Sequence, residues 1–249
     1  MIKYDIHTHT VFSDGKNTPE EMIAYAEKTG IDVLGISDHE YTPMQTSFCI
    51  SLNDRKRYVD TINDLKDKTK VKLYLGIERD YFSPENEFKY DYVIGSVHSI
   101  LKNGEYIDVD HSEEIMEENI KRLYNGNYLE YIKDYYTLVK NIADKTKCDI
   151  IGHFDLVCKF NENNKYFDEN SDDYKMIVLD AAETIANKCE FVEINTGAMH
   201  RGYRTRQYPD NFIIEYFKNK NVKLILSSDS HSAETLCYQF ENIKKYIDK

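Results

Sequence analysis

The sequence predicts an α/β fold built from parallel βα units in a single domain over residues 1–249. Seven short apolar runs alternate with longer helical patterns from one end of the chain to the other, and this alternation is typical of a parallel sheet. No repeat and no Pro-, Gly- or Ser-rich linker interrupts it, so we expect one domain. Side chains that can bind a metal ion follow six of the seven runs, which predicts that they meet at one face of the sheet.

Each expected strand is a short run rich in Val, Ile, Leu and Tyr. These runs show no clear alternation of apolar and polar residues, which suits strands that are covered on both faces. We expect strands at Lys3–His7, Asp32–Ser37, Val71–Ile77, Tyr90–Val97, Asp149–Gly152, Phe191–Asn195 and Val222–Ser227.

The segments between the strands have the periodicity and the end signals of helices. Thr18 begins the first helix as an N-cap, Glu21 completes a capping box and Gly30 follows as a C-terminal cap. The later patterns place apolar residues at helical spacing on an otherwise charged surface. We expect these helices at Asn53–Lys68, Ser112–Leu123, Leu129–Lys145, Ser171–Lys188, Asn211–Asn219 and Ala233–Ile247.

The composition of the chain narrows the range of partners and cellular locations that we expect. The chain has 32 Lys and Arg against 44 Asp and Glu, a formal net charge of −12, which argues against nucleic acid and anionic membranes as partners. Five scattered cysteines without a C-x-x-C pair predict neither disulfides nor a thiolate metal site. The sequence has neither a membrane-spanning apolar run nor the pattern of a signal peptide, so we expect a cytoplasmic protein.

The strongest functional pattern is a set of nine potential metal ligands at the ends of distant strands. Two pairs, His7 with His9 and Asp229 with His231, have a spacing of two, which puts both side chains on the same side of an extended chain. Imidazole and carboxylate ligands without thiolate suit Zn²⁺, Fe²⁺ or Mn²⁺. The full set is His7, His9, Asp14, His39, Glu78, His98, His153, Asp229 and His231.

Each of these residues alone has a plain structural explanation, because a single His or Asp at a strand end is most often a solvated or capping group. We assign His111 and His200 to the surface on that ground. Nine ligands beside six strands are hard to produce by chance. Glu78 is suited to bridge two ions, because a carboxylate has two oxygens, and ions about 3.5–4 Å apart can activate water and clamp both the attacking and the leaving oxygen at phosphorus.

The motifs around these ligands resemble the polymerase and histidinol phosphatase (PHP) family. The similarity runs from residue 5 to residue 231, through His7-Thr-His-Thr-Val-Phe-Ser-Asp14, Ile36-Ser-Asp-His39, Gly76-Ile-Glu78, Gly95-Ser-Val-His98, Gly152-His153 and Ser228-Asp229-Ser-His231. The resemblance implies a distorted seven-stranded β/α barrel with a trinuclear metal site. It places one ion on His7, His9, Glu78 and Asp229, a second on Glu78, His98 and His153, and a third on Asp14, His39 and His231.

A basic loop after the sixth strand indicates the substrate. The segment Arg201-Gly-Tyr-Arg204-Thr resembles a signature of stand-alone histidinol-phosphatases, which implies hydrolysis of L-histidinol phosphate in histidine biosynthesis. Arginine beside a metal cluster can donate two parallel hydrogen bonds to phosphate. We therefore predict Arg201 and Arg204, with Lys159, as phosphate ligands.

We also predict roles for acidic side chains near the expected site. Asp80 and Glu40 are candidates for the cationic end of the substrate. Asp229 and Glu78 are the candidate catalytic residues. Asp38 and Asp155 flank ligands and could orient their imidazoles.

Three other functions are compatible with the same ligands. One is a phosphodiesterase acting on nucleotides or a nuclease, although a nuclease needs a basic track, which is absent apart from one loop. A protein-tyrosine phosphatase also needs arginine near metals. A non-catalytic metal-binding module would arise if ligands were missing, and the complete ligand set argues against it. Ser99 and Glu40 differ from the residues expected after His98 and His39, which bears on substrate fit.

Overall fold

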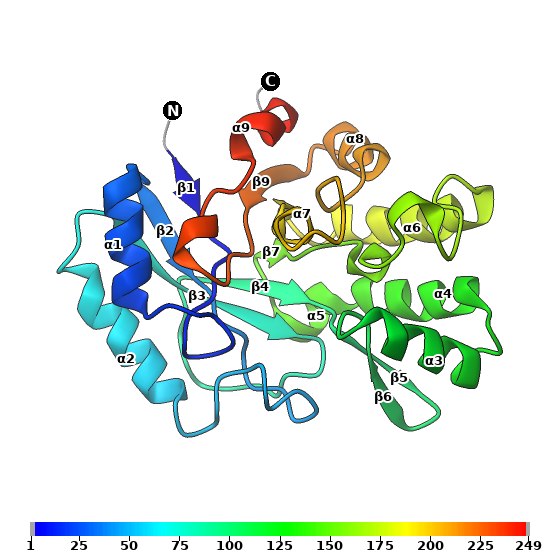
Figure 1. The fold of residues 1–249 in the computed structure, drawn as a ribbon, viewed down its shortest axis with the longest axis horizontal. Coiled ribbons are helices and arrows are strands. Elements are labelled where there is room, and N and C mark those ends of the chain that lie inside the picture. Colours follow the sequence, from blue (N-terminus) through cyan, green and yellow to red (C-terminus); the bar gives the residue numbers. More distant parts are fainter. Residues whose placement is uncertain (1–2, 248–249) are drawn as a thin grey trace.

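Seven parallel strands form the centre of the computed structural model, which describes residues 3–247 (Figure 1). Their order around the sheet is β1-β2-β3-β4-β7-β8-β9, so neighbours in space follow one another in the chain. Every one overlaps an expected strand. They are β1 (Tyr4–Asp5), β2 (Val33–Ile36), β3 (Lys72–Asp80), β4 (Tyr92–Ser96), β7 (Ile150–Ile151), β8 (Phe191–Asn195) and β9 (Lys223–Ser227).

The first and last strands meet just beyond their carboxyl ends. Thr8 and Ser230 form an isolated parallel bridge, in which the His9 amide donates to the Ser230 carbonyl at 2.8 Å and the Ser230 amide donates to the His7 carbonyl at 3.2 Å. The sheet is therefore a nearly closed, distorted seven-stranded β/α barrel, and the predicted fold class is confirmed.

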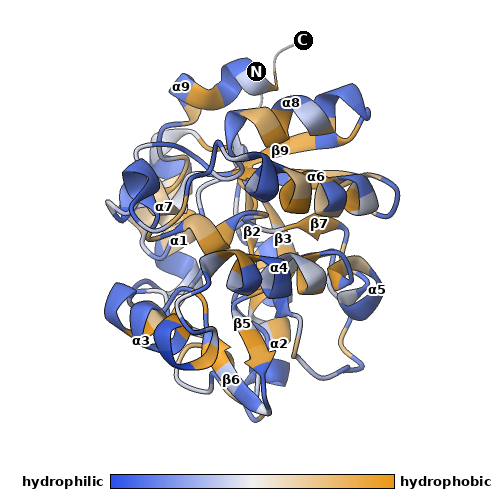
Figure 2. Ribbon diagram, turned by 90° about the vertical axis from the view of Figure 1, so that its right-hand side faces the viewer, coloured by the Kyte–Doolittle hydropathy of each residue, from blue (hydrophilic) through white to orange (hydrophobic). Residues whose placement is uncertain are grey.

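Helices cover the outside of this barrel and turn their apolar sides toward the strands (Figures 1 and 2). Within the described part of the chain, every helix is too short or too polar to span a bilayer. The α-helices are α1 (Pro19–Thr29), α2 (Arg55–Lys66), α3 (Glu113–Leu123), α4 (Tyr128–Val139), α5 (Ile142–Thr146), α6 (Asp172–Ala186), α7 (Gly197–His200), α8 (Asn211–Asn219) and α9 (Phe240–Ile243).

Helix α1 begins and ends where the sequence predicts. The Thr18 hydroxyl accepts a hydrogen bond from the Glu21 amide at 3.2 Å, and the Glu21 carboxylate accepts one from the Thr18 amide at 2.9 Å. Gly30 ends the helix with a left-handed φ of 69°, which glycine adopts without strain.

Two expected helices are wrong in detail. The helix expected at Leu129–Lys145 is divided into two, since α4 ends at Val139 and α5 begins at Ile142. The helix expected at Ala233–Ile247 is broken into a 3-10 turn, the short α9 and a second 3-10 turn. The Asp5 carboxylate accepts a hydrogen bond from the Cys237 amide at 2.8 Å, and Cys237 has a left-handed φ of 57°.

A two-stranded hairpin and a short helix lie outside the sequence prediction. Strands β5 (Ser99–Lys102) and β6 (Glu105–Asp108) form an antiparallel hairpin directly after β4, which projects from the barrel at the lower right of Figure 1. The short α7 follows β8 in the basic loop. Both elements contribute residues to the functional site described below.

An apolar floor closes the barrel interior below its carboxyl ends. Ile6, Ile94 and Ile150 from three strands form a buried cluster, with the Tyr92 ring packed against it. Gly35 and Gly76 face this ring, since a Cβ at either position would lie 2.1 Å and 2.3 Å from its nearest atoms. Because side chains alternate along a strand, Gly76 on the floor and Glu78 above it share the inner face of β3.

The buried Tyr58 hydroxyl ties helix α2 to the barrel. It lies 2.9 Å from the Ile36 carbonyl and 2.7 Å from the Gly76 carbonyl. We expect Tyr58→Phe to lower the free energy of unfolding by about 1–3 kcal/mol, because a buried acceptor loses its donor. Urea titration followed by circular dichroism measures the loss. The matched control Tyr25→Phe, whose hydroxyl forms no hydrogen bond within residues 3–247, should change it by less than about 0.5 kcal/mol; equal effects would contradict this role.

Candidate metal centre

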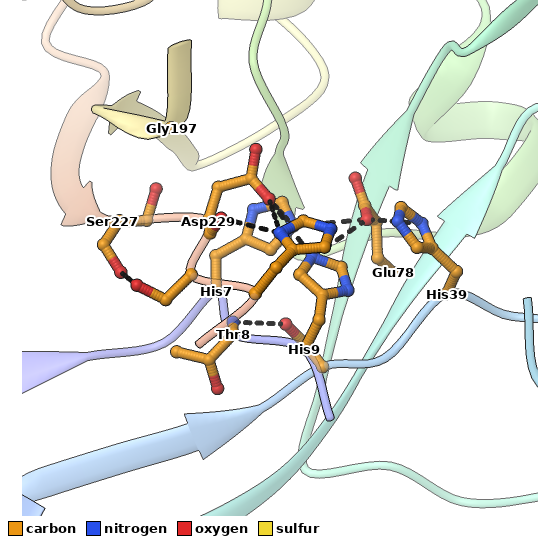
Figure 3. Close-up of polar contacts among 12 residues, drawn as sticks. His7, Thr8, His9, His39, Glu78, Gly197, Ser227 and Asp229 are labelled. Carbon is orange, nitrogen blue, oxygen red and sulfur yellow. Dashed lines mark hydrogen bonds and ion pairs between the residues drawn. The ribbon is translucent and has the colours of Figure 1, made fainter. Parts of the chain in front are cut away.

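All nine predicted ligands converge at the carboxyl ends of the strands. His7 and His9 follow β1, His39 follows β2, and Glu78 lies in β3 two residues before its end. An isolated bridge pairs His39 with Glu78, and the Thr8–Ser230 bridge sets His9 beside the segment that carries Asp229. Figure 3 shows the imidazoles of His7, His9 and His39 turned toward the Glu78 and Asp229 carboxylates. The predicted convergence of side chains from six strands is therefore present.

Three groups within residues 3–247 can each hold a metal ion, since their ligand atoms lie within 4.8 Å of one another. The first contains two histidines from one end of the chain and an aspartate from the other, and in it His9 Nε2 lies 3.2 Å from Asp229 Oδ1. The second surrounds Asp14, whose Oδ2 lies 3.2 Å from His231 Nε2. The groups are His7, His9 and Asp229; His9, Asp14, His39 and His231; and His39, Glu78 and His98.

Glu78 is the centre of the cluster. Its Oε1 lies 2.9 Å from His153 Nε2 and 3.4 Å from His98 Nε2. Its Oε2 lies 2.8 Å from His39 Nδ1, 3.2 Å from His7 Nε2 and 3.7 Å from His9 Nε2. One carboxylate therefore borders five imidazoles, the position that a bridging ligand requires.

Several buried nitrogen atoms of the cluster have no hydrogen-bond partner among the described residues, which is consistent with a site for metal ions. His7 Nε2 and both nitrogens of His9 are buried without a hydrogen bond, although buried polar atoms normally have partners. Aligned lone pairs of imidazole and carboxylate are the donors that a borderline divalent cation uses. The residues present therefore fit divalent ions.

The electrostatics of the cluster keep two of its carboxylates ionised and the His9 imidazole neutral. Burial, with the His231 and His39 rings alongside, lowers the pKa of His9 to about 3, so its imidazole is neutral at pH 7. Burial alone would raise the pKa of Glu78, but His7, His39 and His98 hold it well below its usual range. Asp229 is held ionised in the same way, chiefly by Arg201.

A buried glutamate beneath the cluster escaped the sequence analysis. Glu193 lies in β8, is fully buried, and its Oε2 lies 2.8 Å from His7 Nδ1. The segment Phe191–Asn195 was interpreted only as a strand that leads into the basic loop. A charged residue inside an otherwise apolar run was the available signal, because a buried carboxylate needs partners.

The two aspartates expected to orient imidazoles, Asp38 and Asp155, form hydrogen bonds with other groups instead. Asp38 accepts hydrogen bonds from the Thr10 amide and hydroxyl, each at 2.7 Å, and from the Ser13 amide at 3.2 Å, so it shapes the loop that carries Asp14. Asp155 Oδ2 accepts a hydrogen bond from the Asp210 amide at 2.9 Å. Neither forms a hydrogen bond with an imidazole within residues 3–247, which corrects that expectation.

A cavity of about 430 Å³ opens over the cluster. Arg201 lines it, donates to Asp229 Oδ2 at 2.9 Å and lies 3.2 Å from His231 Nδ1. Lys159 also lines it and donates to the Asp110 carbonyl at 2.6 Å. The predicted phosphate ligands Arg201 and Lys159 therefore lie at the site.

The predicted phosphate ligand Arg204 lies elsewhere. Its guanidinium donates to both Glu169 oxygens at 2.9 and 3.0 Å and to the Cys158 carbonyl at 2.6 Å, and it does not line the cavity. Arg204 thus forms a buried ion pair in the shell outside the barrel, which corrects its expected role. Arg201 differs because it directly follows α7, beside Asp229.

The acidic candidates are only partly available to a substrate. Asp80 lines the cavity, but its Oδ2 accepts a hydrogen bond from the His98 amide at 2.9 Å and lies 3.3 Å from His98 Nδ1. Glu40 lies 2.8 Å from Arg55 Nε and accepts hydrogen bonds from Tyr90 and Asn86. The geometry makes Asp80 a partner of His98.

Several cavity residues were missed or only partly recognised. His111 and His200 are exposed, as expected, yet both lie at the rim of the cavity. Asp108 and Asp110 reach it from β6 and the residues that follow. Because the hairpin was not predicted, neither aspartate could be placed near the metal cluster from the sequence.

Comparison with known families now places the chain. Residues 5–197 match the PHP domain family. The chain belongs to this family. The match covers the strands β1 to β8, and with them seven of the nine predicted ligands.

This PHP domain chain is similar to three histidinol-phosphatases, one of them named as probable. It is 26% identical to the histidinol-phosphatase of Bacillus subtilis over 97% of this chain and 98% of that protein. It is 27% identical to the "Probable histidinol-phosphatase" of Schizosaccharomyces pombe over 77% of this chain, and the matched region spans 65% of that longer protein. The histidinol phosphate phosphatase of Lactococcus lactis, solved with Zn, L-histidinol and phosphate, superimposes with a TM-score of 0.71 at 22% identity, over 99% of this chain and 92% of that chain.

The placement of Arg204 gives a prediction about stability. We expect Arg204→Ala to lower the free energy of unfolding by about 3–5 kcal/mol, because it removes the buried partner of the Glu169 charge and leaves only the half-exposed Arg206 as its ion-pair partner. KM for phosphate esters should stay unchanged in the folded fraction. Urea titration and steady-state kinetics measure the two effects. Arg206→Ala removes a half-exposed partner of the same Glu169 and should cost less than about 1 kcal/mol. A raised KM with unchanged stability would restore Arg204 to the phosphate site.

Proposed function

We propose that this protein is a metal-dependent phosphatase that hydrolyses L-histidinol phosphate to L-histidinol and inorganic phosphate. The observation that carries the proposal is the convergence of the nine predicted ligands, seven of which line one cavity together with Arg201. Similarity to the Bacillus subtilis histidinol-phosphatase along almost the entire length of both chains supports the substrate. The Lactococcus lactis relative, which has this fold, holds zinc, L-histidinol and phosphate.

The proposal includes three divalent ions per chain, zinc, iron or manganese. His7, His9 and Asp229 would hold the first together with Glu78, which would share the second with His98 and His153. Asp14, His39 and His231 would hold the third. When bound, such ions lower the pKa of water and stabilise negative charge at phosphorus.

The side chains of this protein then divide the remaining tasks. Glu78 and Asp229 would serve as catalytic residues by holding the ions, which would supply the activated water. Arg201 donates to Asp229 Oδ2 through one nitrogen and presents its other donors to the phosphate oxygens, where charge develops. Lys159 provides a second positive charge on the cavity wall. Asp80 supports His98, and Asp110 beside Lys159 lines the space for the organic part of the substrate.

The first test combines metal content with substrate choice. We expect about three ions per chain by elemental analysis, loss of activity on chelation, and recovery on adding Zn²⁺, Fe²⁺ or Mn²⁺. L-histidinol phosphate should be turned over faster than a nucleotide diester or a phosphotyrosyl peptide. Fewer than two ions per chain together with no phosphatase activity would contradict the proposal that this protein is a metal-dependent phosphatase. Faster turnover of the peptide or of the diester would show that the substrate belongs to that class and not to the histidinol phosphates.

The second test concerns the phosphate contact. Arg201→Ala should lower kcat/KM for L-histidinol phosphate by about 10²- to 10³-fold, the usual loss when one donor to a developing charge is removed. Arg201→Lys should recover part of this, because the charge remains without the planar geometry. Arg206→Ala, whose side chain lies outside the cavity, is the matched control. Unchanged kinetics in Arg201→Ala at equal metal content would remove Arg201 from the phosphate site.

A further inference from the structure

Glu193 accepts four hydrogen bonds and is completely buried. Its Oε1 accepts from the His153 amide and from Asn195 Nδ2 at 2.8 Å. Its Oε2 lies 2.8 Å from His7 Nδ1 and accepts from the Ser227 hydroxyl at 2.6 Å. Each oxygen thus has two partners, and the partners come from three strand ends besides its own strand.

The alternation of β8 explains this placement. Glu193 and Asn195 face the barrel interior, whereas Ile194 between them packs outside with Ile214 and Leu226. The carboxylate therefore lies below the metal cluster, between the segments that carry His7 and His153. These two histidines belong to different proposed ions.

The contact with His7 determines which ring nitrogen can bind a metal. An ionised carboxylate only accepts hydrogen bonds, so Nδ1 of His7 must carry the proton when it contacts Glu193. The other nitrogen, Nε2, then presents its lone pair, and it lies 3.2 Å from Glu78 Oε2 and 3.9 Å from Asp229 Oδ1. It is also one of the buried nitrogens without a hydrogen bond.

We propose that Glu193 is a positioning residue of the metal centre, which holds His7 in the metal-binding tautomer and fixes its separation from His153. This inference rests on the metal site in the proposed function. A carboxylate behind a ligating histidine orients the ring and increases its basicity. Glu193 performs both tasks for one ligand and fixes the backbone of another.

Replacing Glu193 by glutamine tests this role with almost no change in volume. The His153 amide and the Asn195 amide group can only donate here, so the new carbonyl oxygen must face them. The new NH₂ group then faces His7 Nδ1 and Ser227. His7 Nδ1 must become an acceptor, which moves the proton to Nε2 and blocks its lone pair.

Zinc affinity measured by chelator competition reads out the effect without activity. We expect Glu193→Gln to weaken the tightest zinc site involving His7 by about 10- to 100-fold. The matched control Ser227→Ala removes the other donor to the same oxygen, keeps the contact with His7, and should retain wild-type zinc affinity. A loss in Ser227→Ala as large as that in Glu193→Gln would show a purely structural role and overturn the proposal.

Nitrogen-15 NMR of histidine-labelled, zinc-loaded wild-type protein provides a readout that does not depend on the variant folding. His7 should carry its proton on Nδ1, with Nε2 bound to zinc. A proton on Nε2, or unchanged zinc affinity in a folded Glu193→Gln protein, would overturn the inference. Failure of the wild-type protein to bind zinc, iron or manganese would instead contradict the proposed function, so the two failures are distinguishable.

Discussion

The structure depends on keeping two carboxylates, Glu78 and Asp229, ionised at buried positions inside the barrel. Glu78 is fully buried between imidazoles, and Asp229 lies beside it under Arg201. A buried charge without partners costs several kcal/mol, so the surrounding rings and the guanidinium are needed for the fold as much as for the chemistry. Divalent ions would replace these weak contacts with direct bonds to the same oxygens, which couples metal binding to stability.

A second layer of polar residues holds the ligands in place. Asp5 accepts hydrogen bonds from the Ser228 amide at 3.1 Å and the Cys237 amide at 2.8 Å, on either side of Asp229. Asp38 performs the same task for the loop that carries Asp14. Because buried carboxylates fix the backbone beside several of the ligands, the separations between these ligands are set before any ion arrives.

Much of the fold and of the ligand set could be predicted because both depend on local patterns. Apolar runs mark the strands, and parallel topology then brings residues such as His7 and Glu78 together, whatever their distance in the chain. The β5–β6 hairpin and the broken C-terminal segment escaped prediction because they depend on tertiary contacts. The amide of Cys237, for example, leaves helical geometry for a carboxylate that lies 232 residues away.

The same distinction explains why Arg201 and Arg204 have different roles although they share one loop. Arg201 ends the short α7, where the bridge between β1 and β9 brings Asp229 into reach. Arg204 lies three residues further along the chain, outside the cavity, and pairs with the buried Glu169. Both residues carry the charge that a phosphate site needs, so composition and spacing treat them alike. Which of them lines the cavity depends on where the nearest buried carboxylate lies, and that is a property of the folded barrel.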